Sequence, residues 1–194
     1  MDKQPPTREE AYTLLTRYNQ SESLIKHALA VEGVMRHFAR KFGADEEMWG
    51  VIGLIHDLDY EQFPDQHCTK TAEILAENGW PEAYIRAVVS HGWGICSAVE
   101  PQSDVEKVLY AIDELTGLVT TTVLVRPSRS IMDLKVKSVK KKWKDKRFAA
   151  KVDRGIIEKG AERLGMPIAD LIKETIAGMQ TVAPALGLAG EEKA

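Results

Sequence analysis

An apolar helical run that ends in an adjacent histidine and aspartate constrains this chain more than any other feature. Residues 53–67 read GLIHDLDYEQFPDQH, so His56 and Asp57 end the apolar run and His67 follows an acidic, aromatic loop. An unpaired, ionised carboxylate is very costly in apolar surroundings. A bound metal ion would satisfy both groups, and its remaining ligands must then come from elsewhere in the sequence.

The composition fits one globular domain. The chain has 194 residues, of which 44% are hydrophobic and 28% charged, enough for a sizeable core. A net charge of -3 argues against a general nucleic-acid coat or a membrane-surface protein. No segment has the roughly 18 apolar residues of a membrane span, and the N-terminus lacks the apolar stretch of a signal peptide. We therefore expect a cytoplasmic protein, with Cys68 and Cys96 as free thiols.

Apolar residues recur at spacings of three and four, which predicts an all-α fold. Thr7 with Glu10, and Ser103 with Glu106, have the spacing of capping boxes at helix starts. Residues 118–125 are rich in β-branched side chains, but no other segment supplies strands to pair with them, so a helix is expected there too. Further helices are predicted over residues 21–41, 45–57, 67–78, 81–90 and 153–164, and from residue 167 onward.

The composition changes after residue 125. We expect residues 7–125 to form the metal-binding helical core, residues 126–182 a basic and amphipathic helical extension of the same domain, and residues 183–194 a flexible tail. Residues 135–147 hold eight Lys or Arg against one acid, Asp145. A solvated helix face is the simplest interpretation of this basic segment. A phosphate-attracting rim is the alternative, and nucleic-acid binding is disfavoured by the acidic total.

Several polar side chains interrupt the apolar faces of separate helices. One histidine on such a face is more often a satisfied core residue than a ligand, but several on different helices are harder to explain in that way. Imidazole and carboxylate ligands without thiolate suit iron, manganese, zinc or similar ions. His37, on a polar face, is predicted to be a surface residue. The candidate ligands are His27, His56, Asp57, His67, His91 and Asp113.

The order of His27, the His56-Asp57 pair and Asp113 resembles the HD-domain superfamily of metal-dependent phosphohydrolases, most closely its small stand-alone bacterial members. The likeness covers most of the chain, including AIDELTG around Asp113 and RPSRSIMDLKVKSVKKKWKDKRFA after it. It implies an HD-domain helical bundle with a C-terminal helical extension. It also implies that these four residues bind one metal ion.

The resemblance also covers the other two histidines. His67 and His91 occupy positions where dinuclear members carry further histidines, which implies a second ion bridged through Asp57. Many members have a lysine three residues after the HD aspartate, whereas this chain has Tyr60, after Asp59. Whatever that lysine does for the substrate must therefore be done by another group in this chain. Tyr60 and Trp93, with the glycines near Trp93, are candidates for lining the pocket.

The function implied is hydrolysis of a phosphate ester by metal-activated hydroxide. His56, Asp57, His67 and His91 would take part in catalysis, with one or two divalent ions, iron or manganese favoured over zinc, cobalt, nickel or magnesium. The expected substrate is a nucleotide or a similar small phosphorylated metabolite. No membrane partner is expected, nucleic acid is disfavoured, and a homodimer stays open.

The sequence leaves two other functions open. Some relatives with the same series of ligands resemble di-iron oxygenases, because the ligands alone do not separate hydrolytic from redox chemistry. The other alternative is a sensor module that keeps the metal only as a structural element.

Overall fold

A computed structural model describes residues 5–190 of the chain. Within this range the fold is all-α, as predicted, and two isolated bridges replace any strand. No helix of the described part is both long and apolar enough to cross a bilayer. The helices are α1 (Arg8–Tyr18), α2 (Glu22–Phe42), α3 (Glu46–Ile55), the 3-10 turn η1 (Pro64–Gln66), α4 (Thr69–Glu77), α5 (Glu82–Ser90), α6 (Asp104–Leu124), α7 (Val136–Trp143), α8 (Arg154–Arg163), α9 (Ile168–Gln180) and α10 (Ala183–Leu186).

Both predicted capping boxes are confirmed. The Thr7 hydroxyl accepts the backbone N–H of Glu10 at 3.2 Å, and the Glu10 carboxylate accepts the backbone N–H of Thr7 at 2.7 Å. At the start of α6, Glu106 accepts the backbone N–H of Ser103 at 3.2 Å. The β-branched stretch near residue 120 is helical, because α6 continues through it to Leu124.

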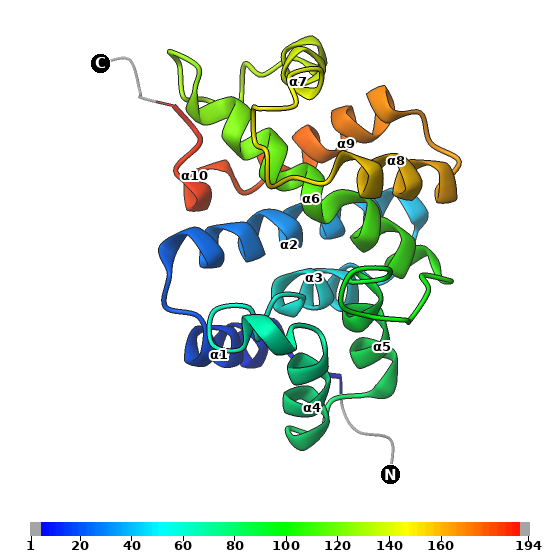
Figure 1. Ribbon diagram of the computed structural model, residues 1–194. Coiled ribbons are helices and arrows are strands. Elements are labelled where there is room, and N and C mark those ends of the chain that lie inside the picture. The colour runs from blue at the N-terminus through cyan, green and yellow to red at the C-terminus, as the bar shows by residue number, and fades with distance from the viewer. Residues whose placement is uncertain (1–4, 191–194) are drawn as a thin grey trace.

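Helices α2 and α6, each 21 residues long, form the centre of the molecule. Figure 1 shows α2 crossing the middle, with α1, α3 and α4 on one side and α6, α8 and α9 on the other. The predicted apolar stripe of α2 is buried, with Val31, Val34 and Phe38 fully inaccessible to solvent. Burying apolar area in this way is the main stabilising term of such a bundle. It also sets α3 and α6 against the same helix, α2.

Glycines allow two pairs of these helices, α9 with α2 and α8 with α6, to approach closely. A Cβ atom on Gly178 of α9 would lie 2.6 Å from the Cα of Val34 in α2. A Cβ atom on Gly160 of α8 would lie 2.5 Å from the Cα of Ala111 in α6. The missing side chains therefore bring the two C-terminal helices directly onto the backbones of α2 and α6. This contact attaches residues 126–182 to the helices that carry candidate ligands.

The expected flexible tail is wrong for residues 183–190. Helix α10 follows directly after α9, and Leu186 and Leu188 are buried, with 5% and 2% of their surface exposed. The backbone N–H of Ile131 donates to the carbonyl of Leu188 at 2.8 Å, which ties this segment to the loop after α6. Burial of the two leucines and this hydrogen bond together dock the segment. Residues 191–194 of the predicted tail lie outside the described residues.

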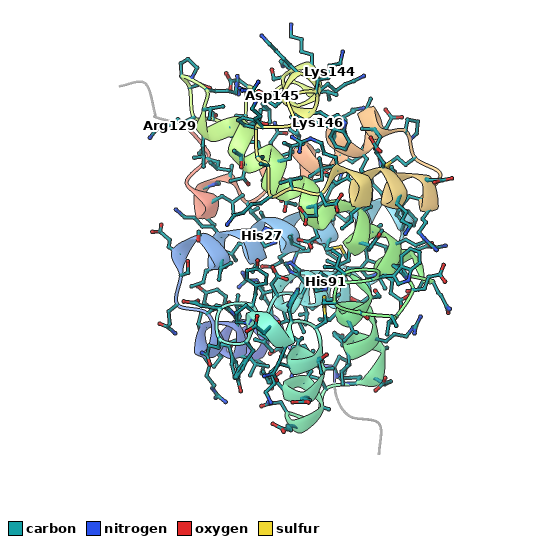
Figure 2. The ribbon with its side chains drawn as sticks, viewed as in Figure 1. His27, His91, Arg129, Lys144, Asp145 and Lys146 are labelled. Carbon is teal, nitrogen blue, oxygen red and sulfur yellow. A yellow bond between two sulfur atoms is a disulfide. The ribbon has the colours of Figure 1, made fainter. Side chains whose placement is uncertain are left out.

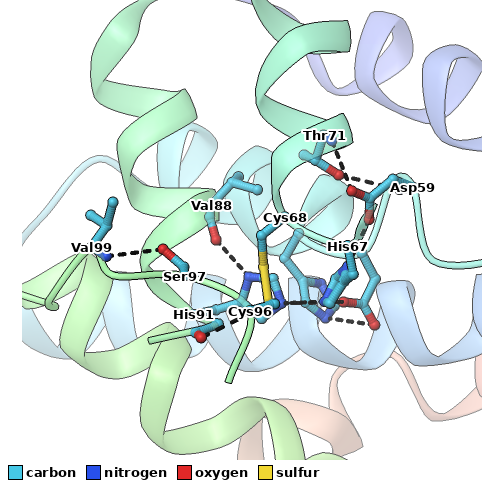
Figure 3. Close-up of a disulfide and its surroundings, with 12 residues drawn as sticks. Asp59, His67, Cys68, Thr71, Val88, His91, Cys96, Ser97 and Val99 are labelled. Atoms are coloured by element: carbon cyan, nitrogen blue, oxygen red, sulfur yellow. Dashed lines mark hydrogen bonds and ion pairs between the residues drawn. A yellow bond between two sulfur atoms is a disulfide. The ribbon is translucent and has the colours of Figure 1, made fainter. Parts of the chain in front are cut away.

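Cys68 and Cys96 were predicted to be free thiols, and this prediction is wrong. They form a disulfide between the residue before α4 and the turn after α5, as Figure 3 shows. The predicted surface position of His37 is also wrong. Its Nε2 lies 2.7 Å from Glu174 of α9, so the polar face of α2 is covered there by another helix. Neither partner could be inferred from spacing along the chain.

Glycine-to-alanine substitutions in two helices should have opposite effects on stability. Gly178→Ala places a methyl group against the backbone of α2 and should cost about 1–3 kcal/mol. Gly117→Ala in α6 meets only Val152, at 3.7 Å, and should gain up to about 1 kcal/mol because alanine favours the helix. Urea unfolding of both variants checks this pair, and equal shifts would contradict the packing described.

Candidate metal centre

His56 and Asp57 lie at the C-terminal end of α3, inside the bundle. The His56 side chain is fully buried, whereas Asp57 keeps 17% of its side-chain surface exposed. His56 Nδ1 donates to the carbonyl of Gly53 at 2.8 Å, which is the last turn of the same helix. Because α3 packs along α2, its end is held next to the ligand candidates of α2 and α6.

One group of candidates comes from three helices. His27 Nε2 of α2 lies 3.2 Å from His56 Nε2 and 3.0 Å from Asp113 Oδ1 of α6. Asp57 Oδ2 lies 3.6 Å from the same nitrogen of His27 and 3.4 Å from that of His56. The structure therefore brings the four residues predicted for the first ion onto one point.

A second group shares Asp57. Its other oxygen, Oδ1, lies 3.5 Å from His67 Nε2 and 3.3 Å from His91 Nε2. The two imidazole nitrogens are themselves 3.2 Å apart. Asp57 thus presents one carboxylate oxygen to each group, and all six predicted residues meet in one centre.

The Nδ1 atoms of these histidines are engaged away from the centre. His56 and His91 donate from Nδ1 to the backbone carbonyls of Gly53 and Val88, at 2.8 and 2.5 Å. A carbonyl only accepts, so the Nδ1 proton is fixed in both residues. His67 Nδ1 donates to Asp59 Oδ1 at 2.7 Å (Figure 3). In their neutral forms these rings therefore direct an unprotonated Nε2 into the centre.

This arrangement fits a metal ion. With Nδ1 protonated, the facing Nε2 atoms of His67 and His91 carry only lone pairs, and two lone pairs 3.2 Å apart repel unless a cation lies between them. The Nε2 atom of His56, whose Nδ1 proton is also fixed, faces His27 Nε2 at 3.2 Å beside the carboxylates of Asp57 and Asp113, where a cation would likewise be favoured. Imidazole and carboxylate donors, oriented by hydrogen bonds on their outer side, are the donor set of hydrolytic divalent ions.

Asp59 is a site residue that the sequence reasoning did not assign. It is fully buried, and its carboxylate accepts both His67 Nδ1–H and the backbone N–H of Thr71, the latter at 2.8 Å. Its own N–H donates to the Thr71 hydroxyl at 3.2 Å. Asp59 therefore fixes His67 to the start of α4. The only signal in the sequence was a second acid two residues after Asp57.

The charges of the centre shift one another's protonation. Burial would lower the pKa of His56, but the carboxylates of Asp57 and Asp113 raise it well above its usual value. Burial would raise the pKa of Asp57 and Asp113, yet the histidines around them hold both below the usual range. His67 also has a raised pKa, because Asp59 and Asp57 outweigh its burial. Without a metal, protons are the cations that balance these carboxylates.

The centre opens into a cavity of about 270 Å³. Tyr60 and Gly92 line it, and the Tyr60 ring lies edge-on to the ring of His67, with centroids 5.2 Å apart. Trp93 does not line it. The indole instead lies under Lys159 and Arg163 of α8, in a separate surface hollow. Of the two aromatic candidates, only Tyr60 therefore reaches the metal centre's cavity.

Glu114 also lines the cavity and was not foreseen from the sequence. It follows Asp113 on α6 and accepts the backbone N–H of Asp153 at 3.2 Å. Burial, together with the charge of Asp113, raises the pKa of Glu114 to about 7. The only signal in the sequence was its position next to a candidate ligand.

The basic segment is far from this centre. In Figure 2, Lys144 and Lys146 lie at the α7 end of the molecule, whereas His27 and His91 lie in its middle. No residue of 135–147 lines the cavity. The alternative of a phosphate-attracting rim therefore has no support at the metal centre, and the simplest interpretation, a solvated helix face, stands.

Comparison with known proteins agrees with this geometry. Residues 24–118 match the family model described as HD domain, a range that contains all six converging residues. No solved structure matches the chain. Residues 24–118 therefore form an HD domain, and members of the HD-domain superfamily are generally metal-dependent hydrolases. The two His/Asp groups of this chain could hold the divalent metal that the family implies.

Replacing Asp59 should weaken metal binding without removing a ligand. Asp59→Asn takes away the charge that holds the His67 ring, and losses of about 10–100-fold in affinity are usual for such outer contacts. Titration of metal-depleted protein with Mn²⁺ measures this loss. Asp65→Asn, an exposed acid in the same loop, is the matched control and should bind as the wild type does.

Metal affinity should rise with pH. A divalent ion needs neutral imidazole, so it must displace the proton that the raised pKa keeps on His56. The folding stability of the metal-free protein should depend on pH in the opposite direction. The charged His56 stabilises the fold at low pH, and this contribution is lost as pH rises through its raised pKa. Calorimetric Mn²⁺ titrations in buffers of different ionisation enthalpy should show proton release, and an affinity independent of pH would contradict this account.

Proposed function

We propose that the protein is a phosphohydrolase that uses two divalent ions. The observation that supports this most is the placement of Asp57, which offers Oδ2 to His27 and His56 and Oδ1 to His67 and His91. Such a shared carboxylate suits two ions held close together. Iron or manganese fits this nitrogen and oxygen donor set best, with zinc, cobalt, nickel and magnesium as further candidates.

The six ligand residues would form two metal-binding groups that share Asp57. His27, His56, Asp57 and Asp113 would hold one ion, and Asp57, His67 and His91 the other. Ions held there would supply Lewis acidity, which polarises a phosphoryl group and lowers the pKa of water toward neutrality. Tyr60 and Glu114 border the space in front of the ligands and would contact the substrate.

The substrate we propose is a small phosphate ester, such as a nucleotide or a similar phosphorylated metabolite. The cavity of about 270 Å³ has room for a phosphoryl group and a small part of its organic group. Nucleic acid is disfavoured, because the basic segment lies away from the centre.

A single experiment separates this function from the two alternatives. Protein isolated without added metal is analysed for metal content, then assayed for phosphate release and oxygen consumption with a panel of phosphate esters. We expect about two ions per chain and phosphate release that is indifferent to oxygen. Oxygen consumption with iron present would favour the oxygenase, and tight metal without any turnover would favour a sensor.

Two histidine variants test the assignment of ligands. His67→Ala should lose one ion and at least about 100-fold of the activity, since changes to outer contacts alone reach that size. His37→Ala, a histidine bound to Glu174 and outside the centre, should keep both ions. If His67→Ala retained wild-type metal content, the assignment of His67 as a metal ligand would be wrong.

A further inference from the structure

Gly117 is unusual among the helical glycines of residues 5–190. Five others would each place a Cβ atom under 3.0 Å from a neighbouring atom, so packing explains them: Gly33, Gly50, Gly53, Gly160 and Gly178. Gly155, in the first turn of α8, would meet Asp153 at 3.2 Å. Gly117, in the middle of α6, would meet only Val152, at the ordinary contact distance of 3.7 Å. No packing requirement accounts for a glycine there.

Such a glycine lowers the stability of the fold. In a helix interior it is less favourable than alanine by about a factor of 5 in the folding equilibrium. Gly117 lies one helical turn beyond Asp113, on the face of α6 that carries this ligand. Together with His27, it lines both the cavity of the metal centre and a second cavity beside it. The open space at Gly117 therefore lies where the two cavities adjoin.

The second cavity, of about 360 Å³, lies between the start of α2, the C-terminal half of α6 and α10. Its walls are largely aliphatic, because Leu124, Leu186 and Leu188 all contribute to them. Leu124 is 49% exposed, which is high for a leucine beside a cavity. An apolar ligand would bury this surface, and that burial would favour binding.

The polar groups of this cavity are mostly engaged by the protein. The Thr121 hydroxyl donates to the Gly117 carbonyl at 2.8 Å, and the Ser23 hydroxyl lies 2.8 Å from that of Ser21. Lys26 is paired with Glu22 at 2.6 Å. Apart from His27, whose Nε2 faces Asp113 in the metal centre, none of the described residues that line the cavity is aromatic, and none is acidic. A nucleobase would lack a stacking partner there, and a sugar would find few free polar groups.

We propose that the second cavity binds the aliphatic organic group of a phosphate ester whose phosphoryl group lies at the metal centre. The chain of the ester would pass over Gly117, where any side chain would narrow the connection. The placement of the phosphoryl group rests on the proposed function, whereas the placement of the aliphatic group does not. It narrows the substrate class from small phosphorylated metabolites in general to phosphate esters with an aliphatic group of several carbons.

The test compares two esters that differ only in chain length. Binding of methyl phosphate and n-hexyl phosphate to the protein as isolated is measured by calorimetry. Each buried methylene adds a factor of about 4 in affinity, so burial of half the added chain predicts a preference on the order of 30-fold for the hexyl ester. A preference below about 3-fold, or tighter binding of AMP or ribose 5-phosphate, would overturn the proposal.

Leu124 and its neighbour supply a matched pair of variants. Both Leu124 and Val125 are exposed apolar residues at the end of α6, at 49% and 54%, but only Leu124 lines the cavity. Leu124→Lys should reduce the hexyl preference by on the order of 10-fold, because a charge would border the bound chain. Val125→Lys should keep the preference. Equal effects of the two substitutions would count against the cavity.

Gly117→Leu tests the connection between the cavities. We expect it to lower the hexyl preference by on the order of 10-fold, because the leucine side chain would narrow the connection. Hydrolysis of both esters is then followed by phosphate release. If hexyl phosphate binds in a Leu124-dependent way but is not hydrolysed, the cavity stands and the proposed hydrolase fails. If both esters are hydrolysed without chain-length preference, the hydrolase stands and the cavity assignment fails.

Discussion

Repulsion among ligand atoms is the constraint on which the rest of this structure depends. Four imidazole nitrogens and three carboxylate oxygens, from Asp57 and Asp113, lie within a few ångströms of one another inside a helical bundle. Burying such a set is unfavourable unless cations balance it. The helices nevertheless hold it in place, because each ligand is anchored through packing or hydrogen bonds directed away from the centre. The fold thus holds these ligand atoms close together, and a divalent ion bound among them would remove their mutual repulsion.

The support for this centre comes from helix packing. Helix α2 contacts α3, α6 and α9, so the three helices that supply the first group of ligands share one core. Glycine contacts at Gly160 and Gly178 attach the C-terminal helices to the same framework. The C-terminal part of the chain therefore stabilises the ligand helices from behind and, through Leu186 and Leu188, also forms a wall of the second cavity.

The loop between α3 and α4 has a different role. His67 lies in the turn between η1 and α4, and two links restrain it: Asp59 holds its ring, and the adjacent Cys68 is joined to Cys96. A ligand on a loop needs such restraints, since loops open more easily than packed helices. The second group of ligands therefore depends on contacts near His67, whereas the first depends mainly on helix packing.

The sequence by itself determined the helical class, the two capping boxes, and the six residues that converge, because helical periodicity and polar residues on apolar faces are local properties of the chain. It did not determine the Cys68–Cys96 bond, the contact of His37 with Glu174, or the docking of residues 183–190, since each depends on segments distant in sequence. The role of Asp59 and the open space at Gly117 were likewise decided by tertiary structure. A buried acid or a helical glycine has the same letter in the sequence whatever surrounds it, and only the packed neighbours show whether it serves packing, a ligand or a cavity.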